Sequence, residues 1–426
     1  MTGTIVRRSE TSDMPNRLAL TFILSTVALD SVGIGIIFPV MPDLMREVTG
    51  ADLATASLWG GVLATSFAVM QFLCGPVVGN LSDRYGRRMV MLVALAVMAL
   101  DYLIMAAAQS VWLLLAGRIV AGASAATFSV ANAYVADISS KAQRARNFGL
   151  IGAAFGLGFI AGPLLGGFAA DWGTRAPFWL AAAFAAANFL FGLVALPESL
   201  APEKRRSFHW RRANPFASFS AIGALPGLKR FLFVMFFYTV AFQSYPSIWA
   251  FFGTARFGWD AWWNGLSLAL FGVAMVIVQA FLVSPAIRRW GEMRTAAYGM
   301  SLDVFVFGFY GFVRSGPMAL VFTPVAAAAG IAGPALSGMM ANATPDDQQG
   351  ELQGVIASVN AIAMGLAPMI MTTVFWAFTH DGAAIHLPGA PFLLSSVLMI
   401  TCVAILVSRS RSSDTHEGPH NLGEHP

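Results

Sequence analysis

The sequence has 426 residues, of which 57% are hydrophobic and only 11% charged, and its mean hydropathy is +0.67. A water-soluble globule of this composition would expose far too much apolar surface, so the composition places the chain in a membrane. The net charge of +4 does not indicate a nucleic-acid partner, because the basic residues form short clusters between apolar stretches. Cys74 and Cys402 lie inside apolar stretches, where cysteine behaves as a small hydrophobe.

Twelve stretches are long and apolar enough to cross a bilayer as helices, since about 20 residues rising about 1.5 Å each span a hydrocarbon layer about 30 Å thick. We place them at 18–40, 58–79, 89–108, 111–136, 149–169, 177–196, 231–252, 263–284, 296–313, 317–340, 355–378 and 391–408. The predicted fold is an all-α membrane protein with two pseudo-symmetric six-helix bundles. Its expected parts are a tail (1–17), a first bundle (18–196), a linker (197–230), a second bundle (231–408) and a second tail (409–426).

The basic residues lie mainly on the side of the proposed spans that carries the linker. That side has Arg7, Arg8, Arg17, Arg84, Arg87, Arg88, Lys141, Arg144, Arg146, Lys204, Arg205, Arg206, Arg211, Arg212, Lys229, Arg230, Arg288, Arg289, Arg294, Arg409 and Arg411. The other side has only Arg46, Arg175, Arg256 and Arg314. Because lysine and arginine concentrate in cytoplasmic loops, we expect both termini and the linker to be cytoplasmic.

Residues 79–88, Gly-Asn-Leu-Ser-Asp-Arg-Tyr-Gly-Arg-Arg, form a short charged hinge between the second and third spans. Glycine lets the loop turn tightly, and arginine keeps it at the membrane surface. Any cytoplasmic loop can carry arginine and glycine, but an aspartate just before a basic cluster suits an ion pair that locks one bundle against the other and is released when the bundles rock. We predict a cytoplasmic gate made of Gly79, Asp83, Arg84, Gly86, Arg87 and Arg88.

The two halves of the sequence repeat this arrangement. Arg84-Tyr85-Gly86 is echoed by Arg289-Trp290-Gly291, and an aspartate follows in the next span of each half, Asp101 and Asp303. Such a duplication is typical of secondary transporters, whose substrate site lies where the repeats meet. The echo is incomplete, since Arg288 takes the position of the hinge aspartate.

Four ionisable side chains lie well inside the spans: Asp30, Asp101, Arg118 and Asp303. Each is costly in hydrocarbon unless it faces a partner or water, and all lie roughly 9–15 Å below the outer surface, so we expect them to line one chamber. A carboxylate facing the permanently charged Arg118 would stay ionised until a proton or a cationic substrate competed. Alternatively one aspartate merely neutralises Arg118, although one arginine cannot pair with all three. No histidine falls within a span, so carboxylates would carry any protons.

Two further groups of residues are candidates for transport. Neutral polar residues within spans could line the substrate path, with interhelical hydrogen bonding as the alternative; they are Gln71, Asn132, Gln243, Ser244, Gln279 and Asn360. The fifth span combines glycines with a proline, which favours a helix bend, although close helix packing also explains the glycines; this motif is Gly158, Gly162, Pro163, Gly166 and Gly167.

These patterns resemble the major facilitator superfamily and, within it, the drug/proton antiporters with twelve spans. The hinge at 79–88 looks like that family's signature between spans 2 and 3, Arg118 followed by Gly122 looks like its second motif, and the glycines of span 5 look like its antiporter motif. The bacterial tetracycline/proton antiporters have patterns similar to Leu29–Gly35, Leu100–Tyr102, Arg256–Trp259 and Gln349–Gly354. The resemblance covers nearly the whole chain except the linker and the tails.

The resemblance implies a pump of the bacterial inner membrane that works as a monomer and exchanges an entering proton for a leaving drug. It assigns Asp30, Asp101 and Asp303 to proton-coupled transport and Arg118 to the buried arginine of the family. It implies no cofactor, since the proton gradient drives transport, although a divalent cation can accompany a chelating substrate. The partners it implies are protons, a small-molecule drug and the lipid bilayer.

The sequence departs from the tetracycline group at positions where substrate would be held. Met275 stands in place of a histidine, and Ser244 and Ser337 stand in place of glutamines, while Phe128 makes span 4 bulkier. The expected substrate is therefore tetracycline-like or another amphipathic antibiotic, with export of a sugar or other metabolite on the same fold as the alternative. A membrane-embedded enzyme would need a nucleophile and base or metal ligands within the spans, and the sequence offers neither.

Overall fold

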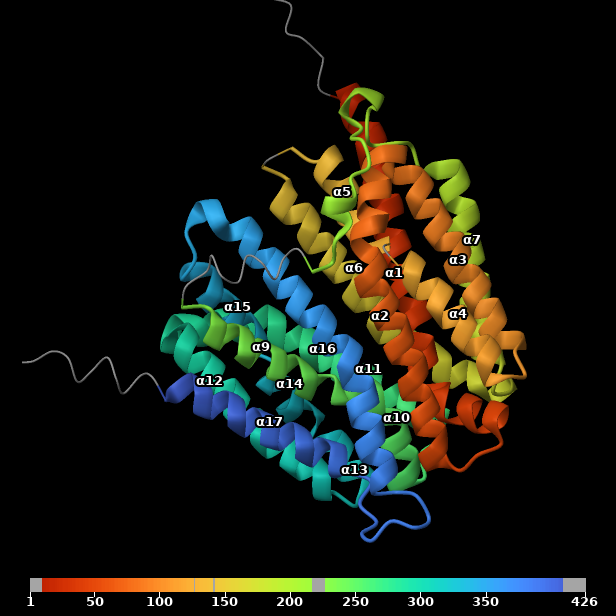
Figure 1. Ribbon diagram of the computed structural model, residues 1–426, viewed down its shortest axis with the longest axis vertical. Helices are drawn as coiled ribbons and strands as arrows, with labels where there is room; N and C mark the ends of the chain where they lie inside the picture. Colours follow the sequence, from red (N-terminus) through yellow and green to blue (C-terminus); the bar gives the residue numbers. More distant parts are fainter. Residues whose placement is uncertain (1–9, 126, 141, 217–226, 409–426) are drawn as a thin grey trace, which may run out of the picture.

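A computed structural model describes residues 10–125, 127–140, 142–216 and 227–408 (Figure 1). Its helices are α1 (Glu10–Thr49), α2 (Leu53–Tyr85), α3 (Arg87–Ala107), α4 (Val111–Ser124), α5 (Thr127–Ile138), α6 (Arg144–Ala169), η1 (Ala170–Trp172), α7 (Ala176–Ala195), η2 (Pro202–Lys204), η3 (Trp210–Ala213), α9 (Lys229–Phe242), α10 (Ser244–Phe257), α11 (Ala261–Ile277), η5 (Val278–Leu282), α12 (Val283–Phe312), α13 (Gly316–Val321), α14 (Thr323–Ala329), α15 (Ala332–Asn342), η6 (Asp346–Gln348), α16 (Gln349–Ala377) and α17 (Ala390–Val407). Outside the described residues lie positions 1–9 and 409–426 of the predicted tails, positions 217–226 of the predicted linker, and Arg7, Arg8, Lys141, Arg409 and Arg411. The side chains of residues 10–17, 145, 211 and 212, which include Arg17, Arg211 and Arg212, are likewise not described.

The described helices agree with the predicted all-α membrane fold. Eleven helical segments in the described ranges are long and apolar enough to cross a membrane. One of them, Ala261–Phe312, covers two predicted spans and is interrupted at Gly291, where φ is 74° and ψ is 165°. Counted across this kink, the segments correspond to the twelve predicted spans.

The breaks between helices follow from local chemistry. α2 begins after Asp52, whose carboxylate accepts a hydrogen bond from the Thr55 backbone N–H at 3.1 Å and so satisfies a donor that the helix leaves free. α2 ends at Gly86, where φ is 104°, a conformation that side chains with a Cβ rarely adopt. Gly291 has the corresponding positive φ in the second half. The repeated sequence thus produces the same type of backbone break twice.

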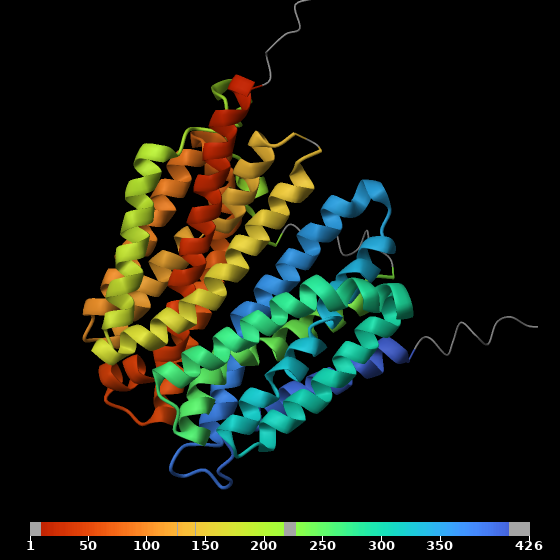
Figure 2. The same cartoon turned by 180° about the vertical axis from the view of Figure 1, so that it is seen from behind.

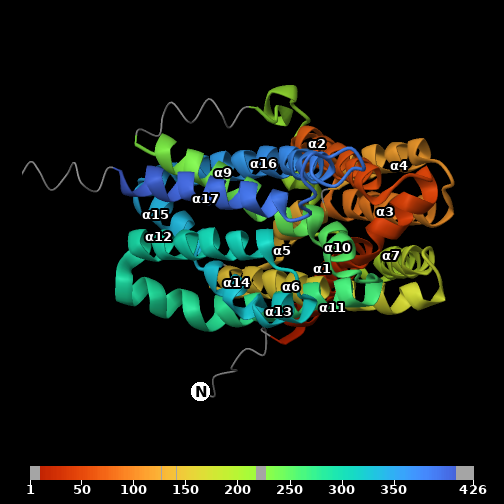
Figure 3. The same ribbon diagram turned by 90° about the horizontal axis from the view of Figure 1, so that it is seen from below.

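The helices from α1 to α7 form one bundle and those from α9 to α17 another (Figures 1 and 2). The bundles meet along two seams, one between α2 and α16 and one between α6 and α11. Figure 3 shows the molecule from below, with α2 beside α16 and α6 beside α11. Figures 1 and 2 show the bundles diverging toward the end at which α7 stops and α9 begins, which we name the linker end; the opposite end is the closed end.

The space around the glycines of the α6–α11 seam shows where the two helices separate. A Cβ built on Gly265 would overlap the carbonyl oxygen of Pro163. One built on Gly156 would meet only Val276, at 3.9 Å, and one built on Gly149 would meet nothing within 4 Å. The helices are therefore in tight contact near the closed end and apart near the linker end.

The α2–α16 seam shows the same gradient. A Cβ built on Gly61 would overlap the Thr372 hydroxyl, and one built on Gly365 would lie 3.6 Å from Val69. A Cβ on Gly75, closer to the linker end, would meet nothing within 4 Å. Both seams therefore open in the same direction, and the structure represents a conformation open toward the linker end.

We expect Gly265→Ala to loosen the closed end, because overpacking a tight contact costs about 1–3 kcal/mol and the obstructing atom is backbone that cannot rotate away. The measurement is the thermal unfolding temperature of the purified protein, which should fall. Gly149→Ala is the matched control, since its new methyl group enters open space. Equal losses in both variants would contradict the proposed seam contact.

Candidate functional site

Asp101 on α3 and Arg118 on α4 form an ion pair inside the first bundle. Nη2 of Arg118 contacts Oδ2 of Asp101, and Nε donates to Oδ1 at 3.4 Å. The two residues are only 2% and 8% exposed. The guanidinium also lies over the ring of Phe67 on α2, 5.2 Å from its centroid, which adds a cation–π contact. Of the alternatives that the sequence left open, neutralisation of Arg118 by one aspartate therefore describes Asp101 in this conformation.

Asp30 lies in the same bundle without joining this pair. It sits on α1, is partly buried, and lies near the side chain of Thr127 at the start of α5. The hydroxyl of Tyr102 lies near it and has no hydrogen-bond partner among the described residues. Of the three ionisable residues within the spans of the first bundle, Asp30 is thus the one without an ion pair among the described residues.

Asp303 occupies the interior of the second bundle. It sits on α12, is 1% exposed, and neither of its carboxyl oxygens has a hydrogen-bond partner among the described residues. Titratable side chains of three other helices lie close enough to interact with it electrostatically: Tyr238 on α9, Tyr245 on α10 and Cys402 on α17. The hydroxyl of Tyr245 is also buried without a partner in the described ranges. An unpaired carboxyl group in such apolar surroundings is costly to ionise.

From their similar depth in the membrane, we expected the four ionisable residues to line one chamber. The structure instead places them in separate surroundings. The Asp101–Arg118 pair is enclosed by the first bundle and Asp303 by the second. Depth along a helix can be counted from the sequence, but the direction in which a side chain points depends on how each helix is rotated in its bundle.

The predicted gate forms a compact ionic cluster around Arg87, at the start of α3. Its Nη1 lies 2.6 Å from Oδ1 of Asp83 on α2 and donates to the Ser82 hydroxyl at 3.0 Å. Its Nε lies 3.3 Å from Oδ2 of Asp137, at the end of α5. Arg87 therefore ties together the linker ends of three helices of the first bundle.

Glu198, which follows α7, caps the first turn of α3. Its carboxylate accepts hydrogen bonds from the backbone N–H groups of Arg87, at 2.9 Å, and Arg88, at 3.3 Å. A Cβ on Gly86 would displace this carboxylate, and the positive φ there favours glycine. Sequence reasoning missed Asp137 and Glu198, whose one signal was that both are acids at span ends on the basic side.

The remaining gate residues have separate surroundings. Arg84 is exposed and lies over the Tyr85 ring, 5.1 Å from its centroid. Arg88 donates to the Leu193 carbonyl oxygen at 2.8 Å, and a Cβ on Gly79 would meet nothing within 4 Å. These contacts, like those of Arg87, lie within the first bundle and the segment that follows α7. The ion pair between bundles therefore stays a prediction for a conformation with closed linker ends.

We expect Asp83→Asn to slow the conformational cycle several-fold, because it removes one of the two charge partners of Arg87 where three helices join. Arg288→Gln, at the corresponding position of the second half, is the matched control and should change transport little. The measurement is the initial rate of substrate uptake into inverted vesicles at equal protein content. The asymmetry between the halves is contradicted if both variants lose the same activity.

The candidate path residues differ in their surroundings. Asn132 donates a hydrogen bond to the Phe128 carbonyl oxygen of its own helix at 3.0 Å, and Ser244, the first residue of α10, donates to the Ala241 carbonyl oxygen of α9 at 2.7 Å. Partly buried positions are held by Gln243, Met275 and Ser337, while Gln279 is exposed in the π-helical turn η5.

Gln71 and Asn360 connect helices instead. Gln71 Nε2 donates to the Ala125 carbonyl oxygen at 3.0 Å, and Asn360 Oδ1 accepts from the Thr239 hydroxyl at 2.9 Å. Both also line a pocket between α2 and α16. These two residues therefore lie where the bundles face each other.

The glycines of the fifth span pack α6 closely against its neighbours. A Cβ on Gly158, Gly162 or Gly166 would overlap or crowd backbone carbonyl oxygens of α1, and one on Gly167 would lie 2.8 Å from the Ala261 carbonyl oxygen of α11. α6 runs as one helix through Pro163. In this structure the observed contribution of these glycines is close packing of three helices.

A two-bundle helical membrane protein with acids buried in both halves and a charged hinge after its second span has the architecture of a secondary transporter. The chain belongs to the major facilitator superfamily, whose family model matches residues 23–368. It is 39% identical over 393 residues to the tetracycline resistance protein, class C, of Escherichia coli, which covers 92% of this chain and 97% of that protein. It is 36% identical to the class G protein of Vibrio anguillarum, over 92% and 97% of the two chains. Among solved structures, the human organic anion transporter MFSD10 (TETRAN) matches with a TM-score of 0.67 and 27% identity, covering 92% of this chain and 99% of that one.

Proposed function

We propose that the protein exports an amphipathic drug from the cytoplasm in exchange for protons. The observation that carries the proposal is the unpaired carboxyl group of Asp303, enclosed in the second bundle while Asp101 in the first is paired with Arg118. An acid without a partner can take up and lose a proton without breaking an existing ion pair. Protonation of Asp303 can therefore shift the conformational equilibrium through the second bundle, while the ion pair of the first bundle stays intact.

The proposed orientation places the linker end and both termini in the cytoplasm of a bacterium, with the chain in the inner membrane. The described conformation would then be open to the cytoplasm and ready to receive substrate. Protons arriving from the periplasm would reach Asp30 or Asp303 when the closed end opens. The alternation needs no cofactor, and it fits a monomer, because both seams and both sets of acids lie within one chain.

The substrate class follows from the relatives and is part of the proposal. The similarity to tetracycline resistance proteins supports a tetracycline-like or another amphipathic antibiotic. The departures from that group expected at Met275, Ser244 and Ser337 favour the broader class of amphipathic antibiotics. A second candidate, export of an organic anion or other metabolite, is favoured by the description of the human relative as an organic anion transporter.

The test uses inverted membrane vesicles that contain the full-length chain. Imposing a proton gradient, acidic inside, should drive uptake of tetracycline or ethidium, and collapsing the gradient with an uncoupler should stop it. Uptake of an organic anion without uptake of either drug would support the second candidate. Uptake that is unaffected by the uncoupler would contradict proton coupling.

A further inference from the structure

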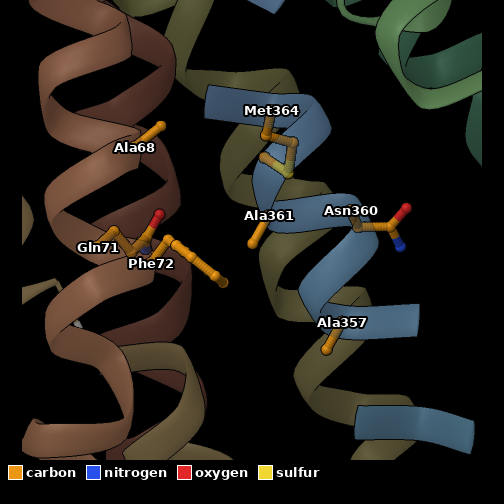
Figure 4. A pocket seen from close by; sticks show the side chains of 7 residues that line it. All are labelled: Ala68, Gln71, Phe72, Ala357, Asn360, Ala361 and Met364. Carbon is orange, nitrogen blue, oxygen red and sulfur yellow. The ribbon is translucent and has the colours of Figure 1, made fainter. Parts of the chain in front are cut away.

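A pocket of about 180 Å³ lies between α2 and α16, where the two bundles begin to separate. Figure 4 shows its lining residues, Ala68, Gln71, Phe72, Ala357, Asn360, Ala361 and Met364, none of which is charged. Toward the closed end the two helices touch at Val69 and Gly365, and toward the linker end Gly75 faces open space. The pocket is thus the innermost point of the opening along this seam.

The size of the pocket limits what it can hold. An apolar cavity of about 150 Å³ accepts one benzene ring, whereas pockets that enclose a whole drug-sized molecule measure about 300–1,000 Å³. At 180 Å³ the pocket has room for one ring and its small substituents. The rest of a larger molecule would extend into the opening between the bundles.

The walls of the pocket suit an aromatic ring. Phe72 reaches from α2 toward α16, and Met364 lies on α16 at the level of Ala68 (Figure 4). An aromatic ring packs favourably edge-to-face on phenylalanine and against a methionine sulfur. The amide of Asn360 points away from α2 in this view, in keeping with its hydrogen bond to Thr239. The alanines leave the space between these walls unfilled.

The segment after α7 supports one of these walls from outside. The ring of Phe216 lies 5.5 Å from that of Phe72 in an edge-to-face arrangement, with an angle of 79° between the rings. The same segment is attached to α2 by hydrogen bonds from Asn80 to the His209 carbonyl oxygen and from the Arg206 N–H to the Asp83 carbonyl oxygen, each 3.1 Å long. Phe216 therefore restricts the orientation of Phe72.

We propose that this pocket binds one aromatic ring of the transported amphiphile and that Phe216 is a positioning residue that holds Phe72 as its wall. The inference rests on the proposed function as a drug exporter and adds a binding site to it. The volume of about 180 Å³ suits a ring better than a lipid acyl chain, which needs a long groove. Because both bundles contribute walls, a bound ring stabilises the conformation that is open toward the linker end.

Ala361→Phe tests the pocket by filling it with a side-chain ring. The full-length protein is placed in phosphatidylcholine nanodiscs, and the dissociation constants of ethidium and tetracycline are measured without a proton gradient. Loss of one buried ring contact should raise the constant of at least one probe by about tenfold or more. Leu366→Phe is the matched control, since Leu366 lies on the same helix, is 46% exposed and does not line the pocket.

Phe216 is tested by the form of its kinetic effect. Phe216→Leu should raise KM for uptake about threefold at unchanged maximal rate, because it loosens a wall without touching the substrate, and Phe216→Tyr should restore the wild-type value. Trp210→Leu, which changes a 77% exposed aromatic residue of the same segment, is the control. A loss confined to the maximal rate would overturn the positioning role.

Three results would overturn the pocket assignment: equal dissociation constants for the Ala361 and Leu366 variants, failure of the wild-type protein to bind either probe, or loss of a retained phospholipid from Ala361→Phe with unchanged probe binding. The last result, followed by mass spectrometry, would identify a lipid site instead. Wild-type protein that binds a probe but does not accumulate it under a proton gradient would contradict the proposed function and leave the pocket assignment standing.

Discussion

Arg118→Ala is expected to reduce strongly the amount of folded protein in the membrane. The change leaves the Asp101 carboxylate, 2% exposed, without its partner inside the first bundle. Breaking a buried ion pair in this way costs about 3–5 kcal/mol, a large part of the about 5–15 kcal/mol that stabilises a typical domain. The loss of the contact with the Phe67 ring adds to this cost. The yield of monodisperse protein on size-exclusion chromatography and its thermal unfolding temperature measure the effect.

The double variant Arg118→Ala with Asp101→Asn distinguishes the effect of an unpaired buried charge on folding from the effect of lost side-chain packing. Removing both charges should restore much of the folded yield, because no uncompensated charge remains, while transport stays low. Glu47→Gln is the control for an exposed pair: Glu47 binds Arg175 Nε at 2.9 Å but is 45% exposed, so its loss should cost at most about 1 kcal/mol. A single Arg118→Ala variant as stable as the wild type would show that the pair is not needed for folding.

Hydropathy alone predicted the membrane-spanning helices, because each span must satisfy its own backbone hydrogen bonds in the bilayer. It did not show that the tenth span is divided into α13, α14 and α15. Pro324 lies at the start of α14 and has no N–H to donate to the preceding turn, so the helix breaks there although every segment remains apolar. Breaks of this kind depend on single residues that a hydropathy average conceals.

The sequence predicted which ionisable residues belong to the candidate site, but it did not predict which partner each of them contacts. An acid or arginine within an apolar span stands out in any sequence, and Asp101, Arg118 and Asp303 were found for that reason. Their partners depend on the rotation of each helix, which the sequence does not give. The contacts of Asp137 and Glu198 were missed because acids at span ends resemble ordinary loop residues until the fold brings them to one arginine.

Asp303→Asn is expected to separate stability from function. The carboxyl oxygens of Asp303 have no hydrogen-bond partner among the described residues, so the uncharged amide of similar shape should leave the unfolding temperature unchanged or raise it. Proton-driven uptake of the drug should fall by about 5- to 150-fold. This is the factor by which the binding of one ligand typically changes the affinity for another. Exchange of labelled for unlabelled drug across proteoliposomes without a gradient should persist, because it needs alternation and not proton release.

These three measurements together distinguish a coupling residue from a structural one. Asp346→Asn, an exposed acid in η6, is the control and should change none of them. Retained gradient-driven uptake in Asp303→Asn would exclude this residue as the coupling acid and direct attention to Asp30, which also lacks an ion pair among the described contacts. Loss of exchange along with uptake would mean that Asp303 is needed for the conformational change itself. The contrast with Arg118 follows from the same physics: a buried charge destabilises the bundle when its partner is removed, whereas a buried acid that has no partner can respond to a proton without breaking an ion pair.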